Sequence, residues 1–143
     1  MRKLGLDLGT KTCGFAITDE LSILATGIEN FLYQNNDFSQ VLKRIEYWQE
    51  FYEYKIDKLV LGFPTNATDG SHNLRTQLVL DFKEYLENNW KHKVDIVLHD
   101  ERFTTKIATE FLKTEGKLKS SKIKKIKDKM SAVVILSDYL NCH

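Results

Sequence analysis

Short apolar segments separated by polar turns follow one another along the first thirty residues of the chain, and the first of them alternates, which is typical of short β-strands. The segments 4–8, 14–18 and 23–28 each predict a strand, and a polar turn at Asp19-Glu20 separates the second from the third. Three short strands in direct succession predict an antiparallel meander.

The apolar spacing then changes to three and four residues, as in amphipathic helices. A first helix should bury Phe38, Val41, Leu42, Ile45, Trp48 and Tyr52, and a second should bury Leu74, Leu78, Phe82 and Leu86. The apolar segments 58–62 and 94–98 predict strands before and after that second helix. A further helix is expected from Thr104 onward. A last helix should present one apolar stripe made of Ile126, Met130, Val133, Val134 and Leu140.

The order of these elements is βββαβαβ followed by helices, which predicts an α/β fold with a mixed five-stranded sheet flanked by helices. Strands that alternate with helices imply parallel pairing through crossover connections in the second half of the chain. Ligands of such sheets bind at the carboxyl ends of the strands. We expect residues 1–143 to form a single domain of this kind.

Composition excludes several classes of protein. Hydrophobic residues make up 42% of the chain and charged residues 29%, which is typical of globular domains. No apolar run reaches the roughly 18 residues that a membrane span needs, and the N-terminus resembles a strand rather than a signal peptide. The expected location is therefore cytoplasmic, with no membrane partner. Cys13 and Cys142 lack the spacing of a zinc site, so both are expected to be thiols.

Charge is unevenly distributed, although the net charge of the chain is only +1. Residues 113–129 contain eight lysines and two acidic residues, a net charge of +6, so the rest of the chain carries −5. Clustered lysines neutralise phosphates and release counterions, which favours a nucleic-acid partner. A solvated lysine-rich loop is the alternative interpretation, and this feature alone leaves both open.

Asp7 is a carboxylate among the apolar residues of the first predicted strand. Such a group is costly to bury unless it is paired with a cation or bound to a metal ion. The nearby Gly5 and Gly9 would let a backbone or a phosphate approach closely. The alternative is an aspartate that caps the turn at the strand end. The residue alone does not decide between these interpretations.

Two further acidic positions could join Asp7. The sequence Asp100-Glu101-Arg102 follows the strand at 94–98, and two adjacent carboxylates on an extended chain point to opposite sides. These acids could instead begin the next helix, where negative charge suits the helix dipole. Asp128 lies among lysines near the start of the last helix, where an ordinary surface ion pair is the alternative.

Three carboxylates brought together would suit phosphodiester hydrolysis. Two Mg²⁺ or Mn²⁺ ions roughly 4 Å apart neutralise charge on the phosphate and activate a water molecule. Both ions prefer hard oxygen ligands, and the chain offers carboxylates rather than a set of histidines and cysteines. The loop at 62–71 opens a helix N-terminus, where anions bind, and Arg75 in its first turn could contact a phosphate. His99 is assigned no role.

Four ordered motifs then point to a family. Residues 5–11 (GLDLGTK), 61–64 (LGFP), 99–104 (HDERFT) and 127–133 (KDKMSAV) together resemble the YqgF/RuvX family. The resemblance covers essentially the full chain, and this family is similar in fold to the Holliday-junction resolvase RuvC. Departures from the family pattern occur at Thr12 and Met130.

The resemblance implies a hydrolase with an RNase H-like fold, a nuclease proposed to process the 5′ end of the 16S rRNA precursor in ribosome biogenesis. A Holliday-junction resolving role has also been proposed for the family. Matched motif by motif, Asp7, Glu101 and Asp128 would be the catalytic residues that hold two Mg²⁺ or Mn²⁺ ions. The role of Asp100 stays open.

Substrate contacts and partners follow as expectations. Phosphates would be contacted by Lys11, Arg75, Arg102, Lys122, Lys124 and Lys125. RNA is the favoured nucleic acid over DNA, the assembling small ribosomal subunit is a candidate partner, and the protein would be a monomer or a weak homodimer. One rival is an actin-like ATP-binding protein, although the chain is too short for the second domain of that class. Another is a catalytically silent nucleic-acid-binding module, which would be expected to lack the three acids.

Overall fold

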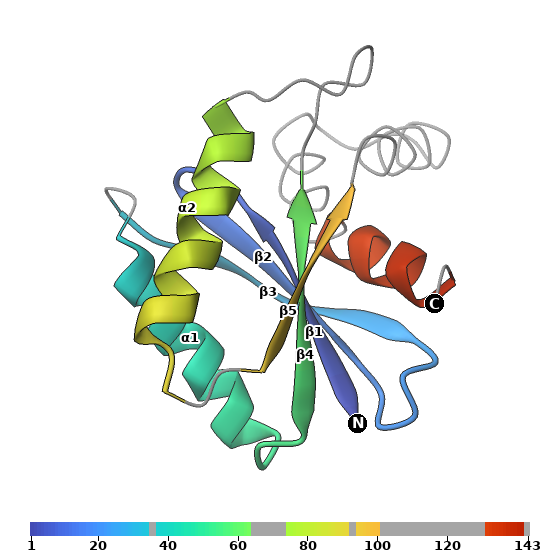
Figure 1. Ribbon diagram of the computed structural model, residues 1–143. Coiled ribbons are helices and arrows are strands. Elements are labelled where there is room, and N and C mark those ends of the chain that lie inside the picture. The colour runs from blue at the N-terminus through green and yellow to red at the C-terminus, as the bar shows by residue number, and fades with distance from the viewer. Residues whose placement is uncertain (35–36, 64–73, 92–93, 101–130, 142–143) are drawn as a thin grey trace.

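The computed structural model describes residues 1–34, 37–63, 74–91, 94–100 and 131–141 (Figure 1). In chain order the elements are β1 (Arg2–Leu8), β2 (Thr12–Thr18), β3 (Ala25–Leu32), α1 (Phe38–Phe51), β4 (Ile56–Phe63), α2 (Leu74–Asn89) and β5 (Asp95–Asp100). Residues 131–141 are also helical and are called the C-terminal helix below. The predicted order of strands and helices is confirmed through β5.

The five strands form one mixed sheet in the order β3-β2-β1-β4-β5. β1 pairs antiparallel with β2, and β2 pairs antiparallel with β3, as expected for a meander. β4 pairs parallel with both β1 and β5, and the helices α1 and α2 lie in the crossover connections. The predicted α/β fold with a mixed five-stranded sheet is therefore confirmed.

The sheet separates two layers of helix. Figure 1 shows α1 and α2 on one side of the sheet and the C-terminal helix on the other. Alternation along β1 sends Leu4, Leu6 and Leu8 into the large core under α1 and α2. On the opposite face a smaller core contains Ala16, Val60, Ala132, Ile135, Leu136 and Tyr139.

Helix α1 begins where its sequence offers a cap. The side chain of Asp37 accepts a hydrogen bond from the backbone N–H of Ser39 at 3.1 Å, which satisfies one of the free amides of the first turn. This bond and the bond from the Ser39 hydroxyl hold the pKa of Asp37 below its ordinary value. Val41, Leu42 and Ile45 are buried on the inner side of the helix, as their spacing predicts.

The third strand differs from its predicted position. The segment 23–28 was the expected strand, whereas β3 spans Ala25–Leu32. The carboxylate of Asp19 accepts hydrogen bonds from the backbone N–H groups of Ile23 at 2.6 Å and Leu24 at 3.0 Å. These amides belong to the turn rather than to the sheet. An apolar pair in a tight turn was thus mistaken for the start of a strand.

The buried side of the C-terminal helix is also rotated from the expected stripe. Its fully packed residues are Ala132, Ile135, Leu136 and Tyr139. Val133 and Leu140 contact this core only partly. The expected helix from Thr104 and the positions Ile126 and Met130 lie outside the described residues. Among the described residues, no helix combines the length and apolar composition needed to cross a membrane.

Candidate functional site

Asp7 lies near the carboxyl end of β1, the central strand of the sheet. Its neighbours Leu6 and Leu8 are buried in the core under α1 and α2, so alternation places Asp7 on the face that the C-terminal helix covers. The residue is half-buried, whereas both leucines are at most 1% exposed. The sequence prediction of a carboxylate at a strand end is confirmed.

Both cross-strand neighbours of Asp7 are glycines. Gly14 of β2 pairs directly with Asp7. On the other side Leu6 pairs with Leu61 of β4, so the next position along both strands brings Asp7 beside Gly62. Glycine within a strand often marks a place where a ligand approaches the backbone closely. The carboxylate therefore has no side chain beside it at its own level on either neighbouring strand.

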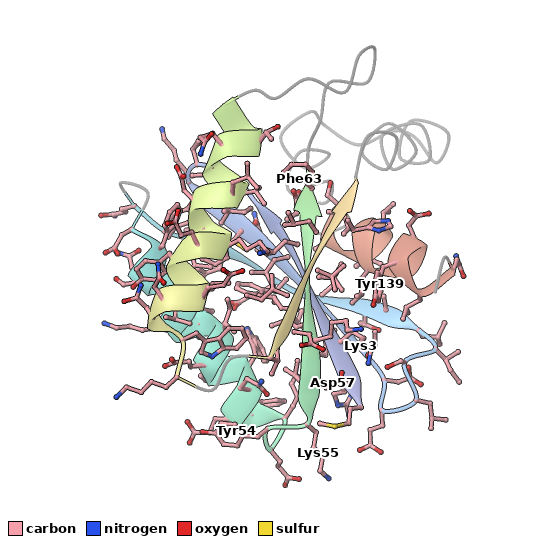
Figure 2. The ribbon with its side chains drawn as sticks, viewed as in Figure 1. Lys3, Tyr54, Lys55, Asp57, Phe63 and Tyr139 are labelled. Carbon is pink, nitrogen blue, oxygen red and sulfur yellow. The ribbon has the colours of Figure 1, made fainter. Side chains whose placement is uncertain are left out.

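The row of Asp7 continues onto β5. Gly62 pairs with His99, so Asp7, Gly62 and His99 occupy one level of three parallel strands, at their carboxyl ends. Strands are spaced about 4.8 Å apart, which puts Asp7 and His99 about 10 Å apart across the glycine. Figure 2 shows the carboxyl end of β4 at Phe63 and its amino end near Asp57.

The turn between β1 and β2 lies at the same edge. Gly9 donates its backbone N–H to the carbonyl of Thr12 at 2.7 Å, and Lys11 in this turn is exposed. Tyr33 braces the turn from the end of β3, because its hydroxyl donates to the carbonyl of Gly9 and its N–H donates to the carbonyl of Lys11. Burial raises the pKa of Tyr33 to about 12, so its hydroxyl stays protonated well into the alkaline range. Sequence reasoning did not find Tyr33.

Cys13 lies beside this site but faces away from it. Its side chain is fully buried in the core under α1 and α2. Burial, followed by the negative charges of Asp7 and Glu29, raises the pKa of the Cys13 thiol well above its ordinary value. The thiol is therefore protonated and poorly nucleophilic, as expected for an inert cysteine.

His99 makes the most specific side-chain contact near the site. Its Nε2 lies 2.6 Å from Oδ2 of Asp138, which belongs to the C-terminal helix. The His99 ring also meets Tyr139 edge to face, with 6.0 Å between ring centroids. A lone histidine gave no signal in the sequence, because its partner is 39 positions away.

Most of the other expected site residues lie outside the described residues: Glu101, Arg102, Lys122, Lys124, Lys125 and Asp128. Arg75 is in α2 and Asp100 ends β5, but their side chains are not described. Within the described part of the chain, no three His, Cys, Asp or Glu side chains are grouped closely enough for a metal ion. The described residues thus supply Asp7 as one of the three expected carboxylate ligands, and its hard oxygen atoms suit Mg²⁺ or Mn²⁺.

The fold has counterparts among solved structures. Thermus thermophilus RuvC in complex with a Holliday junction substrate is similar with a TM-score of 0.57 and 9% identity, covering 99% of this chain and 94% of that one. A second Thermus thermophilus RuvC structure has a TM-score of 0.51 and 10% identity. The architecture is thus the RNase H-like fold of RuvC-type resolvases.

Sequence comparisons are more specific. The family model described as "RuvX: Holliday junction resolvase" matches residues 1–142. A protein of Ureaplasma parvum named "Putative pre-16S rRNA nuclease" is 54% identical over 143 residues, covering 99% of this chain and 97% of its own. A Bacillus subtilis protein of the same name is 41% identical over 141 residues, with 99% and 98% covered. The chain belongs to the RuvX family, as its four motifs predicted.

Proposed function

We propose that this protein is a metal-dependent nuclease that hydrolyses phosphodiester bonds, with Asp7, Glu101 and Asp128 as ligands of two Mg²⁺ or Mn²⁺ ions. The observation that carries the proposal is the setting of Asp7. A half-buried carboxylate lies at the carboxyl end of the central strand, with a glycine beside it on each neighbouring strand. Ligands bind at this edge in such sheets, and glycines within strands often mark places where a ligand approaches the backbone closely.

Glu101 rather than Asp100 is proposed as the second ligand. This choice follows the family motif, in which Glu101 matches the acid of the Asp-Glu-Arg sequence. Bound metal ions would neutralise charge on the phosphate and activate a water molecule. Lys11, exposed at the same edge, is proposed to hold a substrate phosphate. The same role is proposed for Arg75, Arg102, Lys122, Lys124 and Lys125.

RNA is the proposed substrate, specifically the 5′ end of the 16S rRNA precursor, with the assembling small ribosomal subunit as partner. Support comes from the names of the relatives at 54% and 41% identity. A cytoplasmic location and a monomer or weak homodimer complete this proposal.

The deciding experiment is cleavage of end-labelled RNA and DNA panels, including a precursor spanning the 16S 5′ end, with Mg²⁺ or Mn²⁺. Wild-type protein should cut the precursor, and both chelator and Asp7→Asn should abolish cutting. Asp57→Asn is the matched control, since this strand aspartate pairs with Lys3 at 2.8 Å toward the amino end of the sheet. It should cut like wild type. Cutting by Asp7→Asn at the wild-type rate would refute the proposal.

Holliday-junction resolution is the second candidate function. The description of the matching family model and the RuvC fold favour it. Symmetric cutting of two strands needs a two-fold dimer. A four-way DNA junction belongs in the same panel, together with the mass of the protein in solution. Paired symmetric nicks by a dimer would favour this function over RNA processing. Binding without any cleavage would instead indicate a silent nucleic-acid-binding module.

A further inference from the structure

A side-chain hydrogen bond ties the carboxyl end of β5 to the C-terminal helix. Nε2 of His99 lies 2.6 Å from Oδ2 of Asp138, and the His99 side chain is only 13% exposed. A carboxylate can only accept here, so the ring nitrogen donates. The edge-to-face contact with Tyr139 restricts the orientation of the ring further. The bond therefore fixes both the imidazole and the helix turn that carries Asp138.

A second bond holds the same helix turn but at a different place on the sheet. Nζ of Lys58 donates to the hydroxyl of Tyr139 at 3.1 Å, and this bond raises the pKa of Lys58. Lys58 lies in the amino half of β4, whereas His99 lies at the carboxyl end of β5. Figure 2 shows Tyr139 on the C-terminal helix beside the sheet. The two bonds are alike in kind, but only the bond of His99 is next to the site.

His99 also lies where a displacement of β5 would change the geometry beside Asp7. It shares a row with Asp7, and only the glycine Gly62 lies between them on β4. Along the chain, His99 precedes Glu101 by two positions. On the helix side, Asp128 precedes the first described residue of the C-terminal helix, Ser131, by three positions. The bond thus connects the strand that leads to one proposed ligand with the helix that follows another.

We propose that His99 is a positioning residue of the nuclease site. Its bond to Asp138 holds the carboxyl end of β5, which lies in the row of Asp7, against the C-terminal helix. The proposal rests on the nuclease function proposed above and extends it to two residues that touch neither substrate nor ions. Displacement of reacting groups by about 1 Å can lower a catalytic rate by about a hundredfold.

The test compares three substitutions in the cleavage assay, with kcat and KM measured separately. His99→Leu removes the bond to Asp138 and should lower kcat by roughly tenfold or more, with KM changed far less. His99→Gln places an amide N–H where Nε2 lies and should restore most of kcat. Lys58→Met is the matched control, because it removes the other bond of the same helix turn. It should lower the unfolding temperature but leave kcat unchanged.

A double substitution and the stability of each variant complete the test. If His99 acts through Asp138, adding Asp138→Ala to His99→Leu should lower kcat no further, as expected for partners in one contact. Unfolding temperatures show that each variant is folded at the assay temperature. Equal kcat for folded His99→Leu and wild type would overturn the positioning role while leaving the nuclease function intact. Absence of cleavage by wild type would overturn both.

Discussion

The two faces of the sheet are packed by different means. The face under α1 and α2 is covered by a large apolar core that includes Leu6, Leu61 and Phe82, all fully buried. The face under the C-terminal helix (Figure 1) has a smaller core, and Asp7, Lys58 and His99 also lie on this face of the sheet. One face therefore supplies most of the hydrophobic stabilisation, and the other combines packing with polar and charged side chains, of which Asp7 is proposed to act in catalysis.

The C-terminal helix packs closely against β1 at Gly5. A Cβ added at Gly5 would lie 3.0 Å from Cβ of Leu136 and 3.4 Å from the carbonyl oxygen of Ala132. The C-terminal helix thus approaches β1 so closely that a side chain on Gly5 would require Leu136 or the helix backbone to shift by a few tenths of an ångström. Substitutions on the two faces should therefore separate stability from activity.

The largest expected effect is the loss of cleavage in Asp7→Asn. Removal of a residue essential to the chemistry lowers rates by roughly a thousandfold or more. Asparagine has nearly the same shape, so the free energy of unfolding should change little. Initial rates and urea denaturation of the same preparation provide the two readouts. A large drop in stability with an unchanged cleavage rate would show that Asp7 serves the stability of the fold rather than catalysis.

Leu6→Ala, one position away, should give the opposite result. Leu6 is fully buried under α1 and α2, and truncation of such a leucine costs about 2–5 kcal/mol. The cleavage rate should be retained at temperatures where the variant is still folded. Urea denaturation measures the loss of stability, and kinetics at low temperature measure the cleavage rate. A rate that falls as far as in Asp7→Asn would show that the two faces are not separable.

Gly5→Ala tests whether the protein needs the close packing of the C-terminal helix against β1. The added methyl group requires Leu136 or the helix backbone to move, and overpacking of this kind costs about 1–3 kcal/mol. The effect on cleavage is expected to be smaller than that of Asp7→Asn. Denaturation midpoints measure the cost. A variant more stable than wild type would show that Leu136 and the helix backbone can move aside without a cost in stability.

Glu29→Gln tests a charged network between β3 and α1. The Glu29 carboxylate accepts hydrogen bonds from Arg44, including one at 2.9 Å, and from Nε1 of Trp48 at 2.8 Å. Both side chains of the ion pair are less than one-third exposed, and the loss should cost about 1–2 kcal/mol. Cleavage should be unchanged, because this network lies across the sheet from Asp7. A clear change in kcat would show that this network influences the site on the opposite face of the sheet.

The smallest effect concerns the cap of α1 and depends on pH. Hydrogen bonds from Ser39 hold the pKa of Asp37 below its unfolded value of 3.8. A lowered pKa in the folded state stabilises the protein above the unfolded pKa, and this contribution is lost as the pH falls through the folded pKa. Asp37→Ala should therefore be less stable than wild type at pH 7, with the difference shrinking below about pH 4. A pH-independent difference would exclude the carboxylate as its source.

The strands and helices through β5 could be predicted because their periodicity is a local property of the chain. Val41, Leu42 and Ile45 are buried at the spacing that predicted α1. The third strand was misplaced because a single carboxylate, that of Asp19, takes the amides of Ile23 and Leu24 into a turn. Side-chain bonds of this kind compete with the sheet and leave no trace in the apolar pattern.

The sequence by itself determined the family, the order of the elements through β5 and the place of Asp7 near the end of a strand, because motifs and apolar periodicity are local properties of the chain. Only the tertiary structure decided what surrounds that carboxylate. The register brings Gly14, Gly62 and His99 into its row, and the pairing of His99 with Asp138 joins residues 39 positions apart. Strand pairing and helix packing are long-range, so neither spacing nor composition could supply these neighbours.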